Sequence, residues 1–235
     1  MILTGLFGAC LLLGLVSTAP TFDGDKIIIT KEFFPESLVV ATAQHDIVSI
    51  LVPINDINFA DDEVENEDSD FDITLFFVEA DIDAQGKKEY KGLYALKNKK
   101  VTKLLDQGTD ATADSDNSAT AYFSAKDGIY KYNFAENKAE KYGSVDESII
   151  GIAKVNATDL FYILTEDHVL YKVVAEGTKK EKVAEVINAQ QIVLDNENNL
   201  YFYTPNKEVF VVNAGGVQKI EGLPVASSIN LVRPP

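Results

Sequence analysis

The stretch Ala121-Tyr122-Phe123-Ser124-Ala125-Lys126-Asp127-Gly128-Ile129-Tyr130 indicates the fold class of this chain. Its two β-rich runs flank a short polar turn that ends in glycine, an order typical of a β-hairpin. A charged, lysine-rich segment follows from Asn137 to Lys141. Lysine on an outer strand is a common way to prevent edge-to-edge pairing of sheets. The stretch therefore predicts an aromatic hairpin followed by a charged outer strand.

The same arrangement recurs at intervals of about forty residues. The apolar-aromatic pairs have their rings 36, 41 and 39 residues apart, at Leu93-Tyr94, Ile129-Tyr130, Leu170-Tyr171 and Val209-Phe210. A doubled aromatic precedes each pair, at Phe76-Phe77, Tyr122-Phe123, Phe161-Tyr162 and Tyr201-Phe202. In the last three units a polar turn links the doubled aromatic to the apolar-aromatic pair, at residues 126–128, 165–167 and 205–207. A period of this length sets the whole architecture.

A fourth element, short and β-branched, precedes the doubled aromatics in most units. It covers residues 46–51, 148–153 and 190–194, and residues 228–232 look the same. Each unit therefore has four strands, ordered from apolar to charged. This is the order that a propeller blade needs from its central channel to its solvated rim. No long window has helical periodicity, and a β-sandwich does not need the repeat, so an all-β propeller is favoured.

The repeat predicts a β-propeller of about five blades. Four full blades are expected at residues 45–108, 109–146, 147–187 and 188–222. A closing blade is expected from both ends of the chain, with a strand at 226–232 beside the N-terminal run at 26–34. Closure would remove free strand edges, whereas an incomplete, open arc would favour association.

Residues 1–19 predict a secretory signal peptide, because an uncharged apolar run is followed by the small residues Ser17, Thr18 and Ala19. Cleavage within 17–19 would leave a secreted chain with one propeller domain at 20–235. It would also remove Cys10, the only cysteine, so no disulfide is expected. Asn156 begins the sequon Asn156-Ala157-Thr158 and is a glycosylation candidate in a secreted protein.

The net charge of −16 argues against nucleic acid and membrane partners, because such a surface repels phosphate groups. Residues 55–72 are expected to form an acidic, solvated loop, with eight carboxylates between Asp61 and Asp72. Calcium binding there is an alternative, although the run lacks the glycine and terminal glutamate of an EF-hand loop. We expect a monomer without a cofactor.

No catalytic motif occurs in the sequence, so the chain is not expected to be an enzyme. His45 and His168 have no metal-ligand neighbours and are interpreted as surface or strand-end residues. Weak metal candidates lie near the ends of predicted innermost strands, at Asp114, Asp116, Asp195 and Asn196. A calcium ion held there would polarise a lactone or ester carbonyl. The alternative is that Asp and Asn stabilise turns through their own backbone.

The segment from Asp127 to Asn133, followed by Lys138 to Tyr142, resembles the insect haemolymph ommochrome-binding proteins. The similarity extends over about residues 71–223, including Asp195 to Phe202. The resemblance implies a secreted propeller-type protein that binds a planar, tryptophan-derived pigment, but it implies no binding residue. Most rings are expected to fill the spaces between blades, with a subset free to stack on a ligand.

The leading hypothesis is therefore a soluble carrier of a small planar aromatic ligand. Two alternatives stay open from the sequence. One is a calcium-dependent propeller hydrolase, acting as a lactonase or esterase. The other is a non-catalytic extracellular interaction or storage protein.

Overall fold

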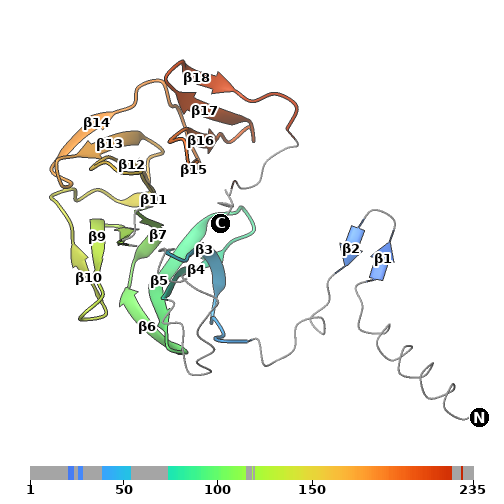
Figure 1. The fold of residues 1–235 in the computed structure, drawn as a ribbon. Coiled ribbons are helices and arrows are strands. Elements are labelled where there is room, and N and C mark those ends of the chain that lie inside the picture. Colours follow the sequence, from blue (N-terminus) through green and yellow to red (C-terminus); the bar gives the residue numbers. More distant parts are fainter. Residues whose placement is uncertain are drawn as a thin grey trace, which may run out of the picture. The chain divides into compact units, whose positions relative to one another are not determined.

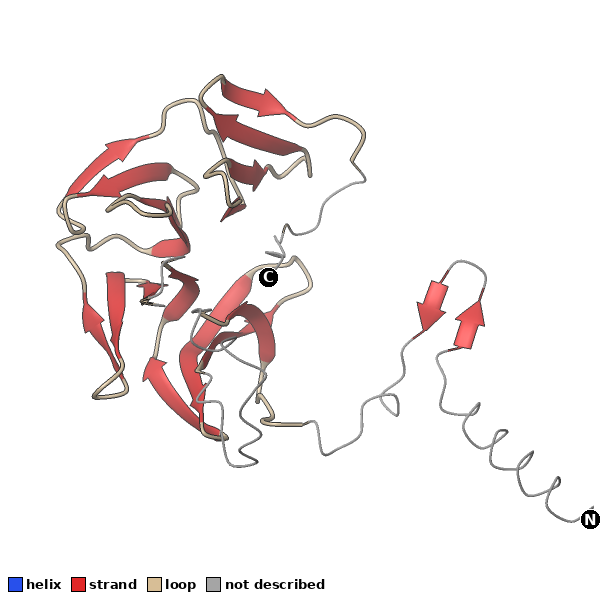
Figure 2. Ribbon diagram, in the orientation of Figure 1, coloured by secondary structure: helices blue, strands red, loops and turns tan. Residues whose placement is uncertain are grey.

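The computed structural model describes residues 21–23, 26–28, 39–53, 74–114, 118, 120–223 and 229. Every regular element among them is a β-strand (Figure 2), so the all-β prediction is confirmed for these residues. Strands β1 (Thr21–Asp23) and β2 (Lys26–Ile28) pair as a short antiparallel hairpin in a unit of their own, residues 1–42.

In the described part of residues 43–235, four antiparallel sheets each use four consecutive strands. The first sheet contains β3 (Asp46–Leu51), β4 (Leu75–Ile82), β5 (Lys88–Lys97) and β6 (Lys100–Leu105). The second contains β7 (Gly108–Ala113), β8 (Ala121–Ala125), β9 (Gly128–Asn133) and β10 (Lys138–Lys141). The third contains β11 (Ile149–Lys154), β12 (Phe161–Thr165), β13 (Leu170–Val174) and β14 (Lys179–Lys182). The fourth contains β15 (Gln191–Leu194), β16 (Leu200–Tyr203), β17 (Val209–Asn213) and β18 (Gly216–Lys219).

The predicted four-strand repeat is confirmed, with a shift at one boundary. Gly108 was expected to end the first blade, but it opens β7 of the second sheet. Figure 1 shows the four sheets around a common centre, with β3, β7, β11 and β15 innermost. The outermost strands carry the lysines that the sequence places there, and all four residues of β14 are exposed.

Aromatic side chains fill the spaces between neighbouring sheets, as expected. Phe76 of the first sheet lies 5.0 Å from Phe123 of the second, measured between ring centroids. Tyr122 of the second sheet lies 4.9 Å from Phe161 of the third in an edge-on arrangement. Such ring pairs add about 1 kcal/mol each to the gain from burial. The third and fourth sheets pack mainly through aliphatic side chains, including Leu164, Leu170 and Leu200.

Several expectations lie outside the described residues. These are the signal peptide at 1–19, the acidic loop at 55–72 and most of the strand expected at 226–232, of which only Ile229 is described. The N-terminal run expected at 26–34 is described only from Lys26 to Ile28, where it pairs with β1. The five-blade count and the single domain at 20–235 therefore stay predictions.

Candidate functional site

A β-bulge recurs on the innermost strands of the first three sheets. The pairing register skips one residue at Val48 in β3, at Thr109 in β7 and at Ile150 in β11. A bulge bends its strand and re-aims the neighbouring side chains. The residues that follow the three bulges occupy equivalent positions on their strands: Ser49, Asp110 and Gly151.

Asp110 uses this position to connect three sheets. Its Oδ1 accepts a hydrogen bond of 2.8 Å from the Ser49 hydroxyl of β3. Its Oδ2 accepts one of 3.1 Å from the backbone N–H of Ile152 in β11. Hydrogen bonds to a charged group are stronger than neutral ones, so this carboxylate is held firmly in place. The Asp110 side chain therefore has a fixed position beside the common centre.

The innermost strands line a cavity of about 1610 Å³. Its wall is mixed. Aliphatic side chains of the innermost strands form one part of it, and charged or polar residues line both ends; the aliphatic part includes Ile50, Leu51, Ile150, Ile152, Ile192 and Leu194. Tyr90 and Tyr203 are the only tyrosines or phenylalanines among the described residues that line it. Ligand pockets commonly have volumes of about 300–1,000 Å³, so this cavity is large enough for a small organic molecule.

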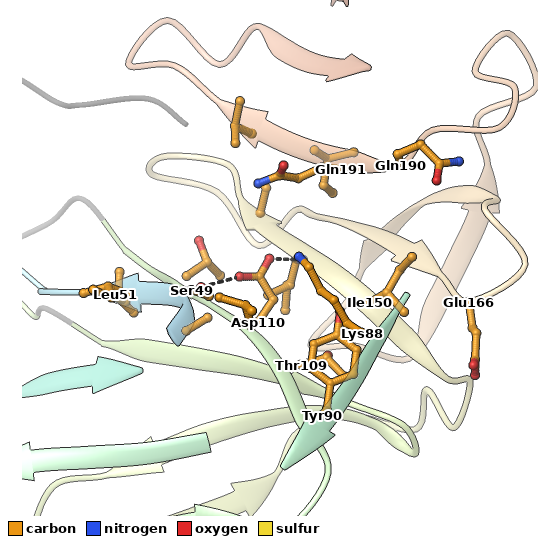
Figure 3. A pocket seen from close by; sticks show the side chains of 18 of the residues that line it. Ser49, Leu51, Lys88, Tyr90, Thr109, Asp110, Ile150, Glu166, Gln190 and Gln191 are labelled. Atoms are coloured by element: carbon orange, nitrogen blue, oxygen red, sulfur yellow. Dashed lines mark hydrogen bonds between the residues drawn. The ribbon is translucent and has the colours of Figure 1, made fainter. Parts of the chain in front are cut away.

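One end of the cavity is lined by the turns that join the second and third strands of the first three sheets, and we call it the hairpin end. Strands β4 and β5 are longer than their counterparts in the other sheets. Their hairpin therefore extends beyond the blade, and the register shift between Glu79 and Ala80 bends it. Figure 3 shows Lys88 of this hairpin reaching toward Asp110, with the Tyr90 ring beside Thr109.

The electrostatics of the hairpin end perturb two titratable groups. Burial raises the pKa of the Asp110 carboxyl, although hydrogen bonds from Ser49 and Ile152 and the charge of Lys88 act against this shift. Burial also raises the pKa of the Tyr90 phenol, and the nearby charges of Asp110 and Glu166 raise it further. At neutral pH the Tyr90 hydroxyl is therefore protonated and available as a donor. It forms no hydrogen bond with any residue that the structure describes.

A small ionic network holds the base of the β4–β5 hairpin. Asp81 contacts Lys91 Nζ at 2.9 Å and His45 Nδ1 at 2.7 Å, and Lys91 also contacts Glu89 at 2.8 Å. The hydrogen bonds from Lys91 and then from His45 lower the pKa of the Asp81 carboxyl. A folded-state pKa below the unfolded one stabilises the fold at neutral pH, and this gain is lost as the pH falls through the folded value. His45 therefore takes part in a network of ion pairs at the surface.

The opposite end of the cavity contains Asp114, one of the weak metal candidates. Its carboxylate lies 2.8 Å from the ammonium of Lys154, with side-chain exposures of 14% and 4% respectively. The Lys154 ammonium also donates to the backbone carbonyl of Thr158 and lies 5.2 Å from the centroid of the Phe161 ring. Asp114 is thus the counter-ion of a buried lysine.

The other metal candidates do not form a cluster in the described structure. Asp195 accepts hydrogen bonds from the backbone of Glu197 and Asn199, and from the Tyr201 hydroxyl at 3.0 Å. Desolvation acts to raise the pKa of Asp195, but these hydrogen bonds outweigh it and lower the pKa. This is the turn stabilisation that the sequence offered as the alternative. Asn196 is exposed and lines the cavity, and Asp116 lies outside the described residues.

Within the described residues, no three His, Cys, Asp or Glu side chains gather closely enough to hold a metal ion. Nor does any helix in that part of the chain have the length and apolar character needed to cross a bilayer.

Two further predicted residues also line the cavity. Asn156 is partly buried, and its backbone N–H donates to Asn198 Oδ1 at 2.9 Å. Its own Oδ1 is buried and has no hydrogen-bond partner among the described residues. His168 contacts the carbonyl of Ala189 at 2.8 Å through Nδ1. It adopts a positive φ of 61° in the β12–β13 turn, which agrees with the strand-end role expected from the sequence.

Comparisons with known proteins support the fold but show neither a family nor a function. No protein-family model and no curated protein matches the chain. The chain is similar to the solved WD40 repeats of RRP9, with a TM-score of 0.51 and 11% identity, over 78% of this chain and 53% of that one. It is also similar to U3-55K, with a TM-score of 0.51 and 10% identity, over 79% and 54% of the two chains.

A structural genomics protein of unknown function from Bacteroides thetaiotaomicron has a TM-score of 0.52 and 11% identity, over 74% of this chain and 43% of that one. The chain therefore spans about half the length of these proteins. WD40 repeats form β-propellers, so the likeness supports a propeller-like architecture for the four sheets.

The residues of the hairpin end are not recognisable as site residues in the sequence. Asp110 lies in β7, whose sequence Gly-Thr-Asp-Ala-Thr-Ala lacks the apolar run that marked the other innermost strands. Lys88 and Tyr90 belong to a hairpin whose extra length is not visible in the repeat. One signal was present: Asp110 precedes Tyr122-Phe123 where the repeat requires an innermost strand.

Proposed function

We propose that this chain carries a small planar ligand in the cavity at the centre of its sheets. The observation that supports this best is a cavity of about 1610 Å³ that combines aliphatic side chains of the innermost strands with polar groups at both ends. In ligand sites, apolar surface contributes affinity and polar groups fix the orientation of the ligand. Two of the metal candidates from the sequence are engaged elsewhere, Asp114 in an ion pair and Asp195 in a turn, so they lend no support to the hydrolase alternative.

The tyrosines of the cavity suggest how a flat ring would bind. Tyr90 and Tyr203 line it, and the aliphatic side chains of the wall offer further apolar contact. Ring stacking on tyrosine is worth about 1 kcal/mol beyond the burial of area. Lys87 and Lys126, which also line the cavity, would meet carboxylates of the ligand. An ommochrome has both a planar ring system and carboxylates, in keeping with the resemblance noted in the sequence.

Titration with xanthommatin tests this function. We expect the visible absorption band of the pigment to shift on binding, with saturation at one pigment per chain. Tyr203→Ala should weaken the binding by several-fold because it removes one ring of the lining. A matched control is Tyr171→Ala, since Tyr171 does not line the cavity. An unshifted spectrum at high micromolar protein would remove this proposal.

We further propose that the propeller has five blades and that the two ends of the chain supply the fifth. The backbone N–H of Ile229 donates to the side chain of Gln191 in β15 at 3.2 Å, so the C-terminal segment returns to an innermost strand. On β3 of the first sheet, Ile50 is 61% exposed and Ile47 is 47% exposed. A further blade beside the first sheet would cover these apolar side chains.

A further inference from the structure

The hairpin end of the cavity brings the Asp110 carboxylate close to the Lys88 ammonium and the Tyr90 ring (Figure 3). Burial raises the pKa of the Tyr90 phenol, and the charges of Asp110 and Glu166 raise it further. Glu166 is held by a hydrogen bond of 2.8 Å from the Ser148 hydroxyl and lies apart from Asp110 in Figure 3. The site therefore combines one positioned carboxylate with a phenol that has no hydrogen-bond partner among the described residues.

The positive and negative members of this site differ in how firmly they are held. Asp110 is fixed by β3 and β11, through Ser49 and Ile152. Lys88 is exposed and lies at the first position of β5, in the extended hairpin. A lysine ammonium is a compact charge on a flexible chain, so it can leave Asp110 without disturbing the sheets. Figure 3 shows the Lys88 side chain beside Asp110, so a primary ammonium fits next to this carboxylate.

We propose that Asp110 and Tyr90 bind the protonated amine of the ligand, which takes the place of the Lys88 ammonium. This inference rests on the proposed function, because it names the chemical group by which the carried ligand is oriented. A carboxylate accepts charge-assisted hydrogen bonds from an ammonium, and the Tyr90 ring attracts a cation at its face. The aromatic part of the ligand would then extend along the aliphatic wall.

Three indole probes that differ only in charge test the proposal on the full chain: tryptamine, tryptophan and indole-3-propionate. The chain contains no tryptophan, so the fluorescence anisotropy of a bound indole can be followed without a protein background. We expect tryptamine to bind at least tenfold more tightly than indole-3-propionate, with tryptophan between them. Equal binding of the amine and the acid, or tighter binding of the acid, would overturn the proposal.

Two variants should change the affinity for tryptamine in opposite directions. Asp110→Asn keeps an acceptor for the Ile152 N–H and a donor for the Ser49 hydroxyl but removes the charge, so binding should weaken by about tenfold. Lys88→Gln removes the competing ammonium, so tryptamine should bind several-fold more tightly. If Lys88→Gln instead weakens indole-3-propionate and leaves tryptamine unchanged, Lys88 anchors a carboxylate and the proposal is wrong.

Matched controls separate these effects from the overall charge of the protein and from misfolding. Asp106→Asn and Lys100→Gln make the same changes in charge on residues that do not line the cavity, and they should leave the affinity unchanged. A circular dichroism spectrum like that of the unmodified chain will show that Asp110→Asn has folded. If xanthommatin binds but none of the charge effects appears, this inference fails and the proposed function stands. If neither xanthommatin nor any indole binds, both fail.

Discussion

Lys154 illustrates how a single side chain can connect two sheets. It belongs to β11, is 4% exposed, and finds its counter-ion Asp114 at the end of β7. Its backbone N–H also donates to the Thr112 hydroxyl at 3.1 Å. Removing water from a charge is costly, so a buried lysine needs both a carboxylate and additional acceptors. Asp114 therefore stabilises the contact between the second and third sheets.

Replacing Asp114 tests this role. Asp114→Ala should lower the free energy of unfolding by about 3 kcal/mol, because it leaves the Lys154 charge buried and unpaired. The double variant Asp114→Ala/Lys154→Met should recover at least half of that loss, since no buried charge is left. Urea unfolding followed by tyrosine fluorescence measures both. A double variant less stable than Asp114→Ala alone would contradict this assignment.

Residue type alone could not distinguish the functions of the carboxylates. Asp114, Asp195 and Asp110 all lie close to the ends or bulges of innermost strands in the repeat. The partners of Asp195 are local, whereas those of the other two come from elsewhere in the chain: Lys154 for Asp114, and Ser49 with Ile152 for Asp110. These partners are 40 to 61 residues away in the sequence, so pairing them requires knowledge of which sheets are neighbours.

At the scale of the strands, Gly128 shows why the β8–β9 hairpin needs glycine. Its φ is 128°, and a Cβ atom there would lie 2.0 Å from the backbone oxygen of Val145. Val145 belongs to the segment that joins β10 to β11, so this close approach lets the chain pass from one sheet to the next. The Asp127-Gly128 signal in the sequence predicted the turn, but not this backbone contact.

Two alanine variants distinguish the energetic cost of backbone strain from the cost of a steric clash with the Val145 backbone. Gly86→Ala, with a φ of 83° and no atom within 4 Å of the new Cβ, should lower the stability by about 1 kcal/mol through strain alone. Gly128→Ala should lower it by about 3 kcal/mol, because the Val145 backbone must also move. Thermal unfolding of the two variants provides the comparison. Equal losses would show that the Val145 contact is unimportant.

For the molecule as a whole, stability depends on how the first and fourth sheets are joined. The hydrogen bond between Ile229 and Gln191 is the described link from the C-terminal segment to the fourth sheet. Sheets with unpaired edges and exposed apolar faces tend to associate. A chain that ends at Leu223 should therefore unfold about 5 °C lower and sediment as oligomers, whereas the full chain should be monomeric.

A point variant serves as the control for the truncation. Gln191→Ala removes only the side chain that Ile229 contacts, so its melting temperature should fall by no more than about 3 °C and it should stay monomeric. A truncated chain as stable and as monomeric as the full one would contradict the five-blade proposal.

The sequence by itself determined the fold class, the four-strand repeat and the hairpin turns. These features depend on neighbours along the chain: alternating apolar residues, turn residues and lysine on outer strands, all visible within one forty-residue unit. The tertiary structure alone decided which carboxylates are held in place, which lysine is buried and which residues line the cavity. Those properties arise where different sheets meet, because the bulges of β3, β7 and β11 bring distant side chains to the same centre.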